Sequence, residues 1–160
     1  MAEDDSRGPN LLVPPPLLFV LPFLEGLVVQ HFVPIAIEKG LEPARILRLV
    51  GVAEILIALG LGAWAVATFR RLRTPVVPRH RASVVAEEGP YALSRNPMYL
   101  GFTILYLGFA FTANALWPLV FLPEAIALVY LFAIKREEQY LTREFGEEYR
   151  VYCARVGRWI

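Results

Sequence analysis

The chain has 160 residues, of which 56% are apolar or aromatic and 19% are charged, against about 25% charged residues in an average soluble domain. This length gives no reason to expect a second domain, and the composition indicates a membrane protein. The single cysteine, Cys153, excludes an internal disulfide and a cysteine-based metal cluster. The net charge is only +1, but the charges are unevenly distributed along the chain. Acidic residues at positions 3–5 precede the first apolar run, so we expect no cleaved leader.

Two apolar stretches in the first half predict membrane-spanning helices, because a bilayer core of about 30 Å needs roughly 20 mostly apolar residues. The first span is expected at residues 17–35, after a proline-rich stretch at 14–16 that we do not expect to be helical. The second span is expected at 46–69. The stretch 70–96 is too rich in arginine and proline to lie in hydrocarbon, so it is expected to be a loop.

The apolar stretch at 99–134 contains one charged residue, Glu124, and would be about 54 Å long as a single helix. It is therefore expected to fold back as a short helical hairpin, with spans at 98–113 and 118–134. Asn114, Trp117 and Pro118 provide the expected turn. The last segment, 135–160, has aromatic residues at helical spacing among charged ones, so it is expected to be an amphipathic helix at the membrane surface or against the loop.

The distribution of basic residues predicts the orientation in the membrane. Two regions carry most of them, namely Arg70, Arg71, Arg73, Arg79, Arg81 and Arg95 after the second span, and Lys135, Arg136, Arg143, Arg150, Arg155 and Arg158 after the fourth. Between the first two spans there are only Lys39 and Arg45. By the positive-inside rule both basic regions are cytoplasmic, which four spans satisfy and three do not. We therefore expect an all-α integral membrane protein with about four transmembrane helices and both termini in the cytoplasm.

The basic loop at 70–81 has no interleaved aromatic residues and adjoins a membrane span, so it is expected to face anionic membrane lipids and not nucleic acid.

The first motif that could carry chemistry is GPYALSRNPMYLG at 89–101. Asn96 is a good N-cap and Pro97 suits the first helical position, so the third span is expected to begin here. A helix N-terminus with Arg95 beside it favours a carboxylate or a phosphate. The alternative is a well-made helix start at a membrane surface that binds no ligand.

The second motif is REEQYLTREFGEEY at 136–149. Adjacent residues on a helix point about 100° apart, so one of Glu137 and Glu138 can face a pocket while the other faces solvent or Arg95. The alternative is a solvated surface helix with salt bridges. Neither motif by itself decides a function.

Together, and in this order, the two motifs resemble the C-terminal core of the isoprenylcysteine carboxyl methyltransferase and phospholipid methyltransferase superfamily. The resemblance covers about residues 74–160, and Thr74 and Pro75 followed by Pro78 are similar to the family's entry to this region. It implies one membrane methyltransferase domain over residues 1–160, with two N-terminal spans at 1–73 and a catalytic core at 74–160. The implied cofactor is S-adenosylmethionine in a cytosol-facing pocket covered by the C-terminal helix. The implied acceptor is a lipophilic or prenylated molecule that arrives from the bilayer.

The resemblance also implies roles for individual residues. The cofactor would be bound by Gly89, Pro90, Tyr91, Asn96, Pro97, Tyr99, Glu137, Glu138 and Tyr149. The residues with implied catalytic roles are Arg95, Arg136 and Glu138, and those that would close the site with Tyr149 are Arg158 and Trp159, the latter on the side of the acceptor.

One departure from the family concerns Asn96, because many relatives have His at this position. Asparagine can form hydrogen bonds but cannot act as a general base. A carboxylate acceptor needs no deprotonation near pH 7, whereas an amine must lose its proton. The sequence therefore favours a carboxylate acceptor, as in isoprenylcysteine carboxyl methylation, or catalysis by positioning alone.

Ionisable residues inside membrane spans are candidates for function. Glu25 and Glu54 lie at comparable depth on the first two predicted spans, and one of them could bind the headgroup of a substrate. The alternative is a buried acid with a hydrogen-bond partner. Glu124 is expected near the outer interface, and His31 is expected to be interfacial.

Three alternatives to carboxyl methylation remain open. The acceptor could be a phospholipid amine, or the chain could be a nicotinamide-dependent membrane reductase of similar architecture, against which its small size argues. It could also be a non-enzymatic membrane protein, which would not bind S-adenosylmethionine. Methyl transfer needs no metal, and residues 74–160 contain no Asp and no His except His80, so no metal site is expected.

Overall fold

The computed structural model describes residue 11 and residues 13–73 and 83–160. The predictions for the acidic residues at 3–5, for Thr74, Pro75 and Pro78, and for Arg79, His80 and Arg81 lie outside the described residues. In chain order the helices are α1 (Pro15–Phe32), α2 (Leu41–Arg71), the 3₁₀ turn η1 (Gly89–Ala92), α3 (Pro97–Thr112), α4 (Leu116–Val129), the π-helical turn η2 (Tyr130–Ile134), α5 (Lys135–Phe145) and α6 (Glu147–Arg155).

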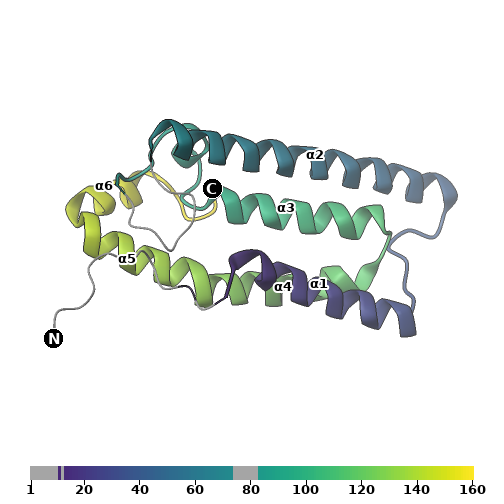
Figure 1. The fold of residues 1–160 in the computed structure, drawn as a ribbon. Helices are drawn as coiled ribbons and strands as arrows, with labels where there is room; N and C mark the ends of the chain where they lie inside the picture. The colour runs from purple at the N-terminus through teal and green to yellow at the C-terminus, as the bar shows by residue number, and fades with distance from the viewer. Residues whose placement is uncertain (1–10, 12, 74–82) are drawn as a thin grey trace.

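The helices pack in pairs, with α2 along α3 and α1 along α4 (Figure 1). α3 also contacts α4 and α1, so it lies between α2 and the α1–α4 pair. The buried core is formed where α1, α3 and α4 meet, around Phe19, Tyr106 and Val129. The expected N-terminal spans and the expected catalytic core are therefore joined in one bundle.

Small residues allow both helix pairs to approach closely, as is common between membrane helices. A Cβ atom added to Gly51 of α2 would lie 2.6 Å from the carbonyl oxygen of Gly108 on α3. A Cβ added to Gly26 of α1 would lie 2.6 Å from the Cα of Pro118 on α4. Both pairs therefore depend on the absence of a side chain at their contact points.

Three helical stretches are long and apolar enough to cross a membrane, namely Pro15–Phe32, Leu41–Arg71 and Leu116–Phe145, and α3 is a shorter apolar helix of 16 residues. Length and composition thus confirm an integral membrane protein. The predicted hairpin is also present, because α3 ends at Thr112, Asn114 adopts a φ of 50°, and α4 starts at Leu116. Trp117 and Pro118 were expected in the turn but lie in the first turn of α4, where proline costs little.

The start of α1 differs from the prediction. Pro15 and Pro16 were expected outside the helix, but α1 begins at Pro15. The first turn of a helix has no intrahelical partners for its backbone N–H groups, so proline costs little there.

The prediction of one separate amphipathic helix at 135–160 is wrong. α4 continues through η2 into α5 as a single helical stretch, and the break comes at Gly146, where φ is 52° and α6 begins. No glycine or proline interrupts residues 124–145, whereas Gly146 can adopt a positive φ at little cost. The last residues, 156–160, are not helical.

The linker between α1 and α2 is fastened to the α3–α4 turn at one end of the bundle. The backbone N–H of Leu116 donates to the carbonyl oxygen of Ile35 at 3.1 Å. The side chain of Asn114 accepts a hydrogen bond from the N–H of Glu38 at 2.9 Å and donates to its carbonyl oxygen at 2.8 Å. At the opposite end, η1, α5, α6 and the C-terminus come together (Figure 1).

Candidate functional site

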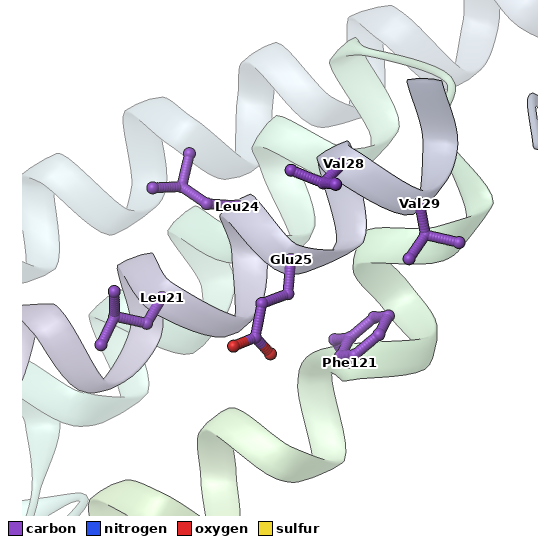
Figure 2. Close-up of a pocket in the computed structure, with 6 residues that line it drawn as sticks. All are labelled: Leu21, Leu24, Glu25, Val28, Val29 and Phe121. Carbon is purple, nitrogen blue, oxygen red and sulfur yellow. The ribbon is translucent and has the colours of Figure 1, made fainter. Parts of the chain in front are cut away.

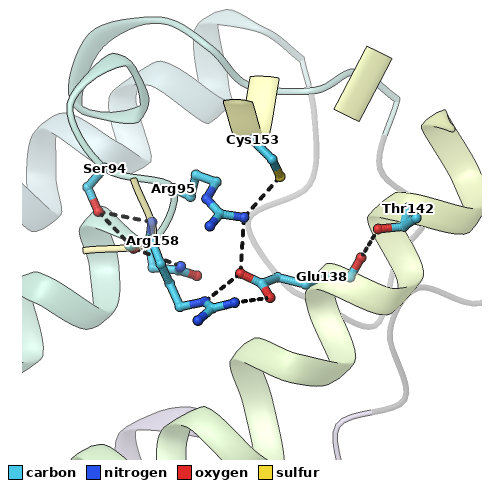
Figure 3. A network of polar contacts seen from close by, with 7 residues as sticks. Ser94, Arg95, Glu138, Thr142, Cys153 and Arg158 are labelled. Carbon is cyan, nitrogen blue, oxygen red and sulfur yellow. Dashed lines mark hydrogen bonds and ion pairs between the residues drawn. The ribbon is translucent and has the colours of Figure 1, made fainter. Parts of the chain in front are cut away.

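A cluster of polar side chains lies at the end of the bundle where α3 begins (Figure 3). We define the polar cluster as Ser94, Arg95, Asn96, Glu138, Cys153 and Arg158. Its members come from the residues before α3, from α5, from α6 and from the C-terminal residues. They meet because α4 and α5 form one rod that returns alongside α3, which places the first turn of α5 beside the start of α3.

Glu138 lies at the centre of the polar cluster. Arg158 donates from Nε to Oε1 at 2.8 Å and from Nη2 to Oε2 at 2.9 Å, and Nη1 of Arg95 lies 3.2 Å from Oε1. Such two-pronged contacts are the stronger class of ion pair. The side chains of Glu138 and Arg95 are 19% and 15% exposed, so water screens their attraction less than on an open surface.

The final residues, 156–160, form what we call the C-terminal strap. The backbone N–H of Arg95 donates to the carbonyl oxygen of Gly157 at 2.9 Å. The carbonyl oxygen of Arg158 accepts hydrogen bonds from Nδ2 of Asn96 at 3.0 Å and from Oγ of Ser94 at 3.4 Å. The strap is therefore held against the start of α3 by donors from three consecutive residues.

The predicted capping role of Asn96 is wrong. Asn96 is the residue before α3, but its side chain forms no capping hydrogen bond and donates to the strap instead. Pro97 begins α3 as expected and is buried. Capping and strap binding use the same short amide group, so the tertiary contact replaces the local one.

Glu137 and Tyr99 form a second contact beside the polar cluster. The hydroxyl of Tyr99 donates to Oε1 of Glu137 at 2.7 Å, which joins the first turn of α3 to the first turn of α5. Glu137 and Glu138 thus have different partners, as expected for neighbours that point about 100° apart on a helix.

The segment Gly89–Ala92 forms η1, and Gly89 adopts a φ of 60° there. Tyr91 is buried, stacks on Phe69 with ring centroids 4.8 Å apart, and accepts a hydrogen bond at its carbonyl oxygen from the hydroxyl of Tyr152 at 2.7 Å. Burial raises the pKa of the Tyr91, Tyr149 and Tyr152 hydroxyls above the ordinary value, at which a tyrosine is already protonated at neutral pH. Tyr91 and the residues that contact it, Phe69 and Tyr152, therefore form what we call the aromatic wall, next to the polar cluster.

The remaining predicted site residues lie on η1, α5, α6 and the strap and differ in how far they are buried. Pro90 is buried in η1, and Tyr149 is buried on α6 with its ring 6.1 Å from that of Tyr152. Arg136 is half-buried on α5 beside Glu137. Trp159 packs against the apolar core, so it anchors the strap on the side of the bundle.

The structure does not bring Glu25 and Glu54 together, because α3 lies between α2 and the α1–α4 pair (Figure 1). Glu54 is half-buried on α2, and its Oε2 has no hydrogen-bond partner among the described residues.

Glu25 faces a groove of about 420 Å³ that is otherwise apolar (Figure 2), lined by Leu21, Leu24, Val28, Val29 and Phe121. Phe121 precedes Glu138 by 17 residues of nearly continuous helix, which is about 25 Å at 1.5 Å per residue. The groove is therefore remote from the polar cluster.

The sequence analysis missed the contributions of Ser94, Tyr130 and Cys153. Nη1 of Arg95 donates to the sulfur of Cys153 at 2.9 Å, and the guanidinium of Arg158 lies over the ring of Tyr130 at 5.2 Å. Nothing in the sequence distinguished Tyr130, because it lies inside the apolar stretch at 99–134. Ser94 stands inside the first motif, and its position beside Arg95 was the available signal.

Replacement of Cys153 by Ser is expected to leave the activity that the resemblance implies within about twofold of wild type. A serine hydroxyl can accept the hydrogen bond from Arg95, and sulfur is a weak acceptor to begin with. Initial rates in detergent, at matched amounts of monodisperse protein, provide the measurement. A loss of more than tenfold in folded protein would show that the thiol itself takes part in the reaction.

The polar cluster is suited to binding an anionic group. Two guanidinium groups face the single carboxylate of Glu138. In addition, Nε of Arg95 is buried and has no hydrogen-bond partner among the residues that the structure describes. A buried donor of this kind favours an acceptor supplied from outside, because leaving it unpaired costs about 1–3 kcal/mol.

Comparison with protein families shows that residues 46–148, more than half of the chain, match the model described as phospholipid methyltransferase. No curated protein and no solved structure matches the chain. The matched residues extend from α2 into the start of α6 and include Arg95, Glu137 and Glu138, while α1 and the C-terminal strap lie outside them.

Proposed function

Because the chain belongs to the phospholipid methyltransferase family of membrane enzymes, which use S-adenosylmethionine, we propose that it methylates a carboxylate on a lipophilic acceptor at the polar cluster. The convergence of Arg95 and Arg158 on Glu138 carries this proposal, because it supplies one more guanidinium than that carboxylate can neutralise. Family membership favours methyl transfer over the reductase and the non-enzymatic alternatives.

The described residues fit S-adenosylmethionine through the unpaired Nε of Arg95, which would hold the carboxylate of its amino-acid part. Glu137 and Tyr99 would bind its polar groups next to the aromatic wall of η1, and Glu138 would hold the two arginines in place. When bound, the cofactor supplies a methyl group that its sulfonium already activates. The protein's own contribution is then to orient the acceptor and exclude water.

A carboxylate acceptor agrees with two features of the site. Asn96 has no titratable nitrogen and its amide is occupied by the strap, so it cannot remove a proton from an amine. A carboxylate is already ionised at neutral pH, so it needs no base at position 96. A prenylated cysteine with a free carboxyl group has both the anionic and the apolar part that such a site requires.

We also propose that all four apolar helices span the membrane and that the polar cluster faces the cytoplasm. α3 is about 24 Å long, which suffices in a bilayer that thins locally. Among the described residues, the cluster end carries Arg70, Arg71, Arg73, Arg95, Lys135 and the basic residues of α5 and α6. The opposite end carries Lys39, Arg45 and Arg48. The positive-inside rule then places the cluster end in the cytoplasm.

The acceptor can be tested with S-adenosylmethionine labelled in its methyl group and vesicles that contain either an S-farnesylated cysteine with a free carboxyl group or phosphatidylethanolamine. We expect label in the farnesylated cysteine, and we expect mild base to release it as methanol, because base hydrolyses a methyl ester. An N-methyl group is stable to the same treatment. The farnesylated cysteine with its carboxyl group amidated serves as the matched control and should remain unlabelled.

Base-stable label in phosphatidylethanolamine, with none in the farnesylated cysteine, would replace the carboxylate by a phospholipid amine as the acceptor. Label in neither, from protein that binds S-adenosylhomocysteine, would require another lipophilic acceptor and would refute the prenylcysteine assignment.

A further inference from the structure

Arg158 contacts Asn96 through its backbone carbonyl oxygen and Glu138 through its guanidinium. Its carbonyl oxygen is held by Nδ2 of Asn96 at 3.0 Å, while its guanidinium binds both oxygens of Glu138 and lies over Tyr130. The backbone position of Arg158 therefore decides where its guanidinium can reach. Because the strap has no helical structure of its own, this position depends on its contacts with the residues before α3 and on the packing of Trp159 against the core.

We propose that Asn96 is a positioning residue, which sets the location of the Arg158 guanidinium on Glu138 by binding the strap. It acts through Arg158 and touches neither cofactor nor acceptor. The effect on the cofactor rests on the proposed function, because Glu138 and Arg95 form the cofactor site there.

The chemistry of the contact requires a donor at position 96. The carbonyl oxygen of Arg158 can only accept, so the amide of Asn96 must present its nitrogen to it. Asn96 is 8% exposed and Ser94, which donates to the same oxygen, is 1% exposed. Water is therefore poorly placed to substitute for a donor that is removed.

This assignment differs from the role that the resemblance implied, in which Asn96 binds the cofactor directly. The replacement Asn96→Asp separates the two roles, because it keeps the size and one oxygen but removes the donor. In the positioning role, the new carboxylate faces the carbonyl oxygen of Arg158, repels it and releases the strap. In a direct role, the same carboxylate would keep or strengthen a contact with the cofactor's ammonium group.

Asn114 provides a matched control at the other end of α3. Its Nδ2 also donates to a backbone carbonyl oxygen, that of Glu38, at 2.8 Å. Asn114→Asp therefore removes the same type of hydrogen bond at a place remote from the polar cluster.

The experiment combines hydrogen exchange of the Arg95 amide, which donates to the strap at Gly157, with calorimetric titration of S-adenosylhomocysteine, both on the full chain in detergent. For Asn96→Asp we expect faster exchange of the Arg95 amide, because release of the strap removes its acceptor, and binding weakened about tenfold, the typical effect of losing one buried hydrogen bond. Asn114→Asp should change neither quantity. In an Arg158→Ala background, which keeps the carbonyl group but lacks the guanidinium, Asn96→Asp should weaken binding no further.

Wild-type exchange of the Arg95 amide in Asn96→Asp, or unchanged or tighter binding of S-adenosylhomocysteine, would overturn the proposal. So would a full additional loss of affinity in the Arg158→Ala background. If Asn96→Asp does not yield folded protein, Asn96→Ala removes the donor without adding charge, and the same results are expected. Failure of the wild type to bind S-adenosylhomocysteine would instead refute the proposed function, while the exchange rates would still test the strap.

Discussion

Glu138→Gln is expected to weaken the binding of S-adenosylhomocysteine by roughly 100-fold and to abolish methyl transfer. The substitution leaves Arg95 and Arg158 facing each other without the carboxylate that holds both of them. Removing one partner from a shielded ion pair typically costs about 3 kcal/mol, which corresponds to a factor of roughly 100. Calorimetric titration into the detergent-purified variant, with its thermal unfolding recorded in parallel, measures the effect.

Glu147→Gln is the matched control for this prediction. Glu147 also pairs with an arginine, Arg150 at 3.3 Å, but its side chain is 77% exposed on α6. An exposed pair of this type contributes little, so binding should stay at the wild-type level. Equal affinities for wild type and Glu138→Gln would remove Glu138 from the site and leave it a structural ion pair.

Gly51→Ala is expected to destabilise the protein by about 3 kcal/mol or to prevent it from folding. The added methyl group would lie 2.6 Å from both the carbonyl oxygen of Gly108 and Oγ1 of Thr112, and 2.7 Å from the backbone nitrogen of Thr112. Two of these atoms belong to the backbone of α3, so α2 and α3 must separate to admit the methyl group. Thermal unfolding in detergent and the yield of monodisperse protein provide the measurement.

Gly60→Ala tests whether this effect comes from the helix contact. Gly60 lies on the same helix, and an added Cβ meets no described atom within 4 Å. Its replacement should leave stability unchanged or slightly increased, because alanine loses less backbone entropy than glycine. Equal stability of the two variants would show that α2 and α3 do not approach as closely as the structure places them.

The sequence by itself determined the membrane character, the four apolar helices and the two motifs of the candidate site. Runs of apolar residues can satisfy their backbone groups in a bilayer only as helices, so composition and length suffice to predict them. The turn at Asn114 was predictable for a similar reason, since a 36-residue apolar helix exceeds the bilayer and the local residues favour a turn. A contact of Arg95 with one of Glu137 and Glu138 was also predictable from their opposite charges, but the sequence left open which glutamate it would be.

The tertiary structure alone decided which residues meet. The sequence places Asn96 at a helix start, where local rules predict a cap, but a more distant acceptor, the carbonyl oxygen of Arg158, occupies its amide. The continuity of α4 with α5 and the break at Gly146 were equally hidden, because a change from apolar to charged residues marks the membrane surface and not the end of a helix. The sequence predicts Glu25 and Glu54 at comparable depth in the membrane, yet the packing order of the helices places α3 between α1 and α2. Periodicity describes the faces of single helices, whereas the contacts between helices depend on small residues such as Gly51 and Gly108, whose partners only the folded chain reveals.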